Sequence, residues 1–127
     1  MPRHLQTVLT EVTNAGPDVR LLVLQDPDGW DLPPFRPGAH LLLHLKNGMT
    51  RAYSLCGDPA VRDRYLIAVK REGSGKGGSA FVHDALSRGD RIDLSLPRSN
   101  FPLVQGATRH VFFAGGIGVT PFLSMIP

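Results

Sequence analysis

The chain has 127 residues, of which 42% are hydrophobic and 20% charged, a balance typical of a globular domain and not of a disordered chain. No apolar run is long enough to span a membrane and the N-terminus lacks the apolar core of a signal peptide, so we expect a cytoplasmic protein. The single cysteine, Cys56, excludes an intramolecular disulfide and a cysteine-ligated iron–sulfur cluster within this chain. The net charge of +3 comes from cations that form no run, so we predict neither a nucleic-acid nor a membrane partner.

Alternation of apolar and polar residues predicts six strands. They span residues 6–12, 18–24, 40–45, 49–55, 65–70 and 91–96. Turn signals separate them at Asn14–Pro17 and at Asn47-Gly48, and a proline-rich loop spans 26–38, in which Trp30 is expected to cover one end of the fold. One short helix is predicted from Ser79, its N-cap, to Leu86. This pattern predicts a mostly β fold, a six-stranded antiparallel barrel with one short helix.

The last quarter of the chain has a different pattern. Residues 97–106 form a connector without periodicity, and residues 110–114 are the short apolar run of a strand buried on both faces. A glycine turn at 115–121 and an apolar helix start at 122–126 follow. We therefore predict a barrel domain over 1–106 and the truncated start of an α/β nucleotide-binding domain over 107–127. The chain is then a fragment of a longer protein, and its apolar end is expected to favour self-association.

The first candidate binding segment is Arg51-Ala52-Tyr53-Ser54, at the end of the fourth predicted strand. A guanidinium, an aromatic plane and a hydroxyl in so short a run suit a flat ring that carries a phosphate. An ordinary strand with one exposed arginine and a packed tyrosine is the alternative. Because Arg51 and Tyr53 share one face and Ser54 lies on the other, one ligand touches all three only if the strand twists or ends there.

The second candidate is the glycine-rich segment 73–79, which leads into the predicted helix. Unpaired amides at a helix N-terminus favour an anion, and glycines let it approach the backbone; a plain surface loop capped by Ser79 is the alternative. The third is the turn with Gly116 and Gly118, which lacks the third glycine of a dinucleotide fingerprint. The histidines show no metal-ligand spacing, and we predict no metal site.

In this order, the three segments resemble the flavin-binding domain of the ferredoxin reductase superfamily. The likeness is strongest to the reductases of Rieske oxygenases, the phthalate dioxygenase reductase and vanillate O-demethylase reductase family. The stretches that carry it are Leu32-Pro33-Pro34-Phe35, Arg51-Ala52-Tyr53-Ser54-Leu55-Cys56, Ile67-Ala68-Val69-Lys70-Arg71, Gly75-Lys76-Gly77-Gly78-Ser79, Ser95-Leu96-Pro97-Arg98 and residues 114–125. The resemblance implies a Greek-key barrel of the ferredoxin-reductase flavin-domain type.

The resemblance also implies an FMN site. In it, Arg51 binds the phosphate, Tyr53 stacks on the isoalloxazine ring, and Ser54 reaches the N5 edge. The remaining implied contacts come from Ala52, where the family has Thr, from the backbone of Ile67, Ala68 and Val69, from Lys76, Gly77, Gly78 and Ser79 around the phosphate, and from Thr120. No catalytic side chain is implied.

Reductases of this family pass a hydride from NADH to FMN and then single electrons to a two-iron two-sulfur cluster and an oxygenase. This chain lacks the NADH and iron–sulfur domains, so it is expected to bind flavin without oxidising NADH at a useful rate. Two alternatives stay open. One is an FAD-binding domain of a ferredoxin–NADP reductase-like enzyme, and the other is a cofactor-free basic β-barrel that binds a partner.

Overall fold

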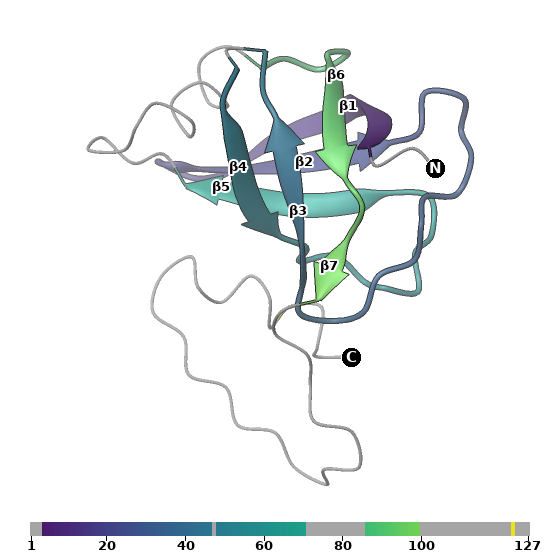
Figure 1. Ribbon diagram of the computed structural model, residues 1–127. Coiled ribbons are helices and arrows are strands. Elements are labelled where there is room, and N and C mark those ends of the chain that lie inside the picture. Colours follow the sequence, from purple (N-terminus) through teal and green to yellow (C-terminus); the bar gives the residue numbers. More distant parts are fainter. Residues whose placement is uncertain (1–3, 47, 71–85, 100–122, 124–127) are drawn as a thin grey trace, which may run out of the picture.

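The computed structural model describes residues 4–46, 48–70, 86–99 and 123, and these residues form one antiparallel sheet. Its strands are β1 (His4–Gly16), β2 (Val19–Gln25), β3 (Ala39–His44), β4 (Thr50–Ser54), β5 (Tyr65–Lys70), β6 (Arg91–Ser95) and β7 (Arg98–Ser99). The strand order is β4-β3-β6-β1-β2-β5, with the short β7 paired to β3 (Figure 1). All six predicted strands are confirmed. The predicted helix at 79–86, the domain boundary at 106/107 and most of the apolar end at 112–126 lie outside the described residues.

Two hairpins join neighbouring strands. The predicted turn at Asn14–Pro17 was wrong in position, because β1 continues to Gly16, which pairs with Val19. A register shift between Asn14 and Gly16 keeps these residues within the strand, and the turn consists of Pro17 and Asp18. The predicted hairpin at Gly48 is confirmed, since Gly48 adopts φ +85° and its N–H donates to the carbonyl oxygen of Leu45 at 3.0 Å.

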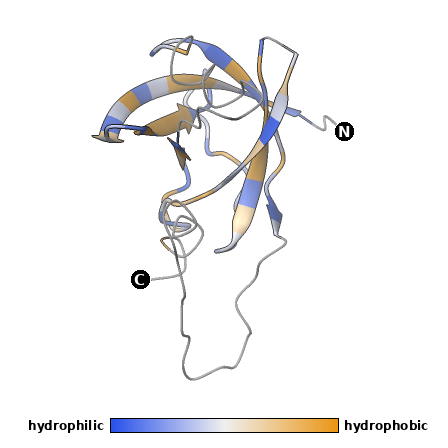
Figure 2. Cartoon of the chain, turned by 90° about the vertical axis from the view of Figure 1, so that its left-hand side faces the viewer, coloured by the Kyte–Doolittle hydropathy of each residue, from blue (hydrophilic) through white to orange (hydrophobic). Residues whose placement is uncertain are grey.

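The core lies mainly on one face of each of the six long strands, as the alternation predicted. Hydrophobic and hydrophilic residues succeed one another along the strands in Figure 2. The fully buried side chains on the inner face include Leu9, Leu22, Leu24, Leu41, Leu43, Leu55, Ile67, Val69 and Leu94. Thr7 is also buried, and its hydroxyl donates to the carbonyl oxygen of Ile92 at 2.8 Å. The buried polar group therefore has a partner, as burial requires.

The long loop between β2 and β3 is held by side chains other than the one expected. Trp30 was predicted to cover one end of the fold, but it is 73% exposed. Leu32 is buried in its place, and its N–H donates to the carbonyl oxygen of Arg62 at 2.9 Å. Phe35 packs edge-to-face on Tyr65, whose hydroxyl donates to the carbonyl oxygen of Pro33. The smaller Leu32 and the paired aromatic rings fill the space, so the indole ring stays outside.

The two strands at the ends of the strand order, β4 and β5, come together just beyond Ser54. Leu55 forms a β-bridge with Ile67 of β5, while its N–H donates to the carbonyl oxygen of Ala39 next to it in β3 at 2.9 Å. In Figure 1, β4 descends across the end of β5. One residue thus touches both ends of the sheet. None of the described residues forms a helix long and apolar enough to cross a bilayer.

Candidate functional site

Strand β4 presents Arg51 and Tyr53 on one face. Arg51 pairs with Leu43 and Tyr53 with Leu41, and side chains of directly opposite residues in an antiparallel pair lie on the same face. Both side chains are half-buried, while Ala52 between them is exposed on the other face. The expectation that Arg51 and Tyr53 share a face is therefore confirmed.

Strand β4 ends at Ser54 and keeps its regular pairing with β3 up to that residue. Beyond Ser54 the chain turns from β3 toward β5, as the bridge between Leu55 and Ile67 shows. Ser54 is half-buried at this turning point. Ser54 pairs with His40, so its side chain lies on the face of β4 opposite to Arg51 and Tyr53.

Strand β5 supplies the other side of the site. Ile67 and Val69 are fully buried in the core, and Ala68 is 8% exposed on the opposite face. One edge of the β5 backbone pairs with β2, and the other edge faces β4. Because the side chains of Ile67 and Val69 point into the core, contacts from these two residues to a ligand between β4 and β5 have to come from the backbone.

The seven predicted residues that the structure describes lie on two strands that contact each other. Arg51, Ala52, Tyr53 and Ser54 lie on β4, and Ile67, Ala68 and Val69 lie on β5, joined through Leu55. The other predicted residues, Lys76, Gly77, Gly78, Ser79 and Thr120, fall outside the described part of the chain.

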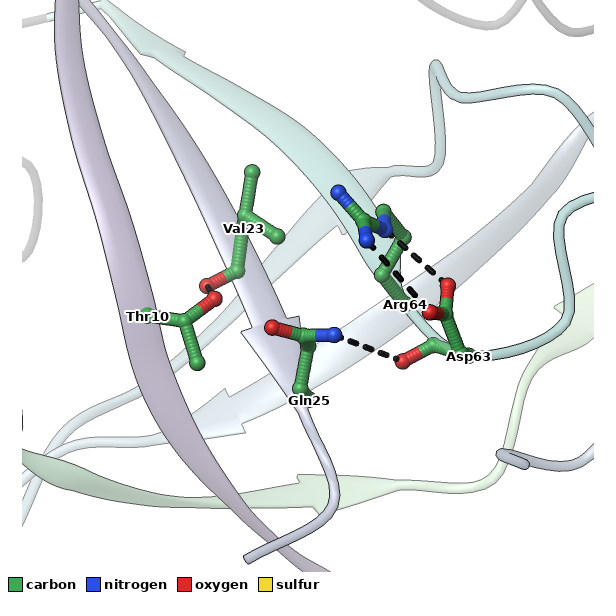
Figure 3. Close-up of polar contacts among 5 residues, drawn as sticks. All are labelled: Thr10, Val23, Gln25, Asp63 and Arg64. Carbon is green, nitrogen blue, oxygen red and sulfur yellow. Dashed lines mark hydrogen bonds and ion pairs between the residues drawn. The ribbon is translucent and has the colours of Figure 1, made fainter. Parts of the chain in front are cut away.

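The charge of Arg51 is not neutralised within the described residues. Its Nη1 donates to the carbonyl oxygen of Thr50 at 2.8 Å, and the ion pair found in this part of the molecule joins other residues, Arg64 and Asp63, at 3.0 Å. Figure 3 shows that pair together with Gln25, whose Nε2 donates to the carbonyl oxygen of Asp63 at 3.4 Å. The hydrogen bond from Arg64 lowers the pKa of Asp63. A guanidinium without a carboxylate partner suits an anionic ligand.

Sequence reasoning missed the residues that join β4 to β5. Cys56 is buried and its thiol is free. Its backbone N–H and its thiol both point at the carbonyl oxygen of Leu66, at 2.9 and 3.4 Å. The sequence signal for this arrangement is only the position of Cys56 and Gly57 directly after the Arg51–Leu55 run.

Burial raises the pKa of the Cys56 thiol from 9.0 to about 11. We expect Cys56 to react slowly with iodoacetamide in the native chain at neutral pH, and rapidly after unfolding in urea, because the thiolate is the nucleophile. Between pH 9 and about 11 the unfolded chain loses this proton and the native chain keeps it. The free energy of unfolding should therefore fall as the pH rises through this window.

Urea unfolding at several pH values and a time course of alkylation measure both effects. Cys56→Ser is the control, since it removes the alkylation and this part of the pH dependence. Equal alkylation rates in the native and unfolded chains would contradict the assigned burial.

Among the described residues, no group of three His, Cys, Asp or Glu side chains is placed to hold a metal ion. The described site therefore offers one guanidinium, one aromatic ring, one hydroxyl and a strand backbone. Such a set binds a planar ring with a phosphate by hydrogen bonds, stacking and charge.

Comparison with known proteins identifies relatives over most of the chain. The chain is 50% identical over 108 residues to phthalate dioxygenase reductase of Burkholderia cepacia. The matched segment covers 85% of this chain and 34% of that protein. It is 42% identical over 121 residues to a vanillate O-demethylase oxidoreductase of Pseudomonas putida, with coverages of 95% and 38%. No family model matches the chain.

A solved structure agrees with these relatives. It is phthalate dioxygenase reductase, described as a modular structure for electron transfer from pyridine nucleotides to a [2Fe–2S] centre. The TM-score is 0.94 at 45% identity, over 96% of this chain and 38% of that one. The chain thus spans little more than a third of the length of the relatives named here. Over most of its length the chain is therefore similar to one segment of phthalate dioxygenase reductase and of vanillate O-demethylase oxidoreductase, the proteins to which the sequence resemblance pointed.

Proposed function

We propose that this chain is the FMN-binding module of an NADH-dependent reductase that passes electrons to an iron–sulfur centre and a Rieske-type oxygenase. The observation that carries the proposal is the half-buried Arg51, which forms no ion pair among the described residues and shares a face with Tyr53. The likeness to reductases of oxygenase systems supports the electron-transfer role. A bound flavin accepts a hydride and gives up its electrons singly, and so links a two-electron donor to a one-electron acceptor.

The proposed roles of the residues follow from their chemistry. Arg51 donates two parallel hydrogen bonds to the phosphate, an interaction worth about 1.5–3 kcal/mol for a charged group. Tyr53 stacks on the ring, and Ser54 donates a hydrogen bond at its N5 edge. The backbone of Ala52 and of Ile67–Val69 contacts the ring edge. Outside the described residues, we propose that Lys76, Gly77, Gly78 and Ser79 bind the phosphate and that Thr120 approaches the ring.

We also propose the larger arrangement that the resemblance implies. Residues 1–106 form a closed six-stranded Greek-key barrel, whose closure is favoured by the bridge from Leu55 to Ile67. Residues 107–127 begin the nucleotide-binding domain. NADH, the iron–sulfur cluster and the oxygenase then bind to other parts of the whole protein, so this segment alone binds flavin and does not oxidise NADH.

The test is retention of flavin by the purified chain. The chain is incubated separately with FMN, FAD and riboflavin and desalted, and its visible absorption is recorded. We expect FMN to be retained with a band shifted from that of free flavin, and riboflavin to be lost, because riboflavin has no phosphate for Arg51. Retention of FAD in preference to FMN would favour the FAD-binding branch. Failure to retain any flavin would contradict the proposed function.

A further inference from the structure

Cys56 and Gly57 hold Leu66 from two directions. Two hydrogen-bond donors of Cys56, its N–H and its thiol, converge on the Leu66 carbonyl oxygen. Gly57 lies against the side of the same residue: a Cβ at position 57 would stand 3.1 Å from the Leu66 Cβ and 3.7 Å from its backbone nitrogen. The first of these distances is shorter than ordinary van der Waals contact, so a side chain at position 57 requires Leu66 to shift by a few tenths of an ångström.

These contacts of Cys56 and Gly57 with Leu66 lie between the end of β4 and residues 67–69 of β5, the two parts of the candidate site. Leu66 immediately precedes Ile67, and Cys56 follows Ser54 by two residues, with only the bridging Leu55 between them. The close approach of Gly57 to Leu66 therefore lies beside the bridge that joins the end of β4 to residues 67–69 of β5. A displacement of β5 at Leu66 moves the backbone of Ile67 with it.

We propose that Gly57 and Cys56 are positioning residues of the flavin site, which set the distance between Ser54 and the backbone of residues 67–69. This inference rests on the proposed function. Neither residue needs to touch the flavin. Gly57 acts by the absence of a side chain, and Cys56 acts by fixing the Leu66 carbonyl.

The reason for glycine here is space and not backbone conformation. The glycines with left-handed φ among the described residues are Gly29, Gly38, Gly48 and Gly89, and Gly57 is not one of them. A backbone hydrogen bond weakens when its donor–acceptor distance moves a few tenths of an ångström beyond the optimum. A branched side chain at position 57 would push β5 away by such an amount, and would weaken the contacts at the flavin edge while leaving the sheet intact.

The test compares Gly57→Val with Gly16→Val, a matched control. Gly16 also lacks a left-handed φ, and a Cβ there would meet nothing within 4 Å. We expect Gly57→Val to weaken FMN binding about tenfold, a factor that matches the upper end of the free energy of one hydrogen bond. We also expect a change in the visible absorption of the bound flavin and in its midpoint potential. Gly16→Val should match the wild-type chain in all three. Far-UV circular dichroism confirms that each variant keeps the sheet, and Gly57→Ala replaces Gly57→Val if the larger side chain prevents folding.

A complementary change tests the contact itself. Leu66→Gly removes the Cβ that a new side chain at position 57 would meet, so the double variant Gly57→Ala with Leu66→Gly should bind FMN better than the sum of the single effects predicts. Wild-type affinity and an unshifted spectrum in Gly57→Val would overturn the positioning role alone. If the wild-type chain binds no flavin, the proposed function fails and the positioning role fails with it. Flavin binding by the wild-type chain therefore distinguishes a failure of the positioning role from a failure of the proposed function.

Discussion

Replacing Arg51 by Ala is expected to weaken FMN binding about 10- to 100-fold, the factor that corresponds to losing a charge-assisted hydrogen bond. The half-buried guanidinium has no ion-pair partner among the described residues, so its charge is available to the phosphate. Affinity is measured by the quenching of flavin fluorescence on titration. Arg51→Lys should fall between the wild type and Arg51→Ala, since it keeps the charge and loses the two-pronged geometry.

Two controls separate phosphate binding from general damage. Arg88→Ala removes a cation of equal charge from an exposed position in the turn before β6, and should leave the affinity unchanged. Riboflavin, which carries no phosphate, should bind Arg51→Ala and the wild-type chain equally weakly. An equal loss of FMN affinity in Arg51→Ala and Arg88→Ala would show that Arg51 has no specific role.

Leu94→Ala is expected to destabilise the fold by about 2–5 kcal/mol, the range for removing a fully buried leucine. Leu94 is 0% exposed, and it pairs with Leu5 in β1 and with Leu43 in β3. Strand β6 thereby joins the β3–β4 hairpin to β1, β2 and β5, so a cavity at Leu94 weakens the contact between both halves of the sheet.

Urea unfolding monitored by circular dichroism measures this loss. Leu96→Ala is the matched control, because Leu96 lies two residues further along and is 43% exposed; its change should stay within about 0.5 kcal/mol. Similar losses in the two variants would contradict the placement of Leu94 at the centre of the core.

Much of the fold could be predicted from local pattern. Alternation identified all six long strands and their buried faces, because a strand places successive side chains on opposite sides. The glycine at position 48 marked its hairpin, because a turn there needs a backbone conformation that glycine adopts without strain. The shared face of Arg51 and Tyr53 followed from the same periodicity. These features depend on residues close to one another in sequence.

Other features depend on which distant segments meet. The two-residue strand β7 has no pattern of its own. Strand β6 ends at Ser95, whose hydroxyl accepts a hydrogen bond from the N–H of Leu42 at 2.9 Å. The chain then pairs again with β3 at Arg98. Trp30 was misplaced for a related reason, since Leu32 and Phe35 compete for the same interior and fit it.

The sequence by itself determined the six long strands, the shared face of Arg51 and Tyr53, and the residue types on β4 that we propose as a ring-and-phosphate site. Only the tertiary structure decided that β6 inserts between β3 and β1, and that the end of β4 meets β5 through Leu55 and Ile67. It alone placed Gly57 against Leu66, where the absence of a side chain matters. The physical reason is that periodicity fixes which way a side chain points, while the close approach of two backbones depends on packing between residues far apart in the chain.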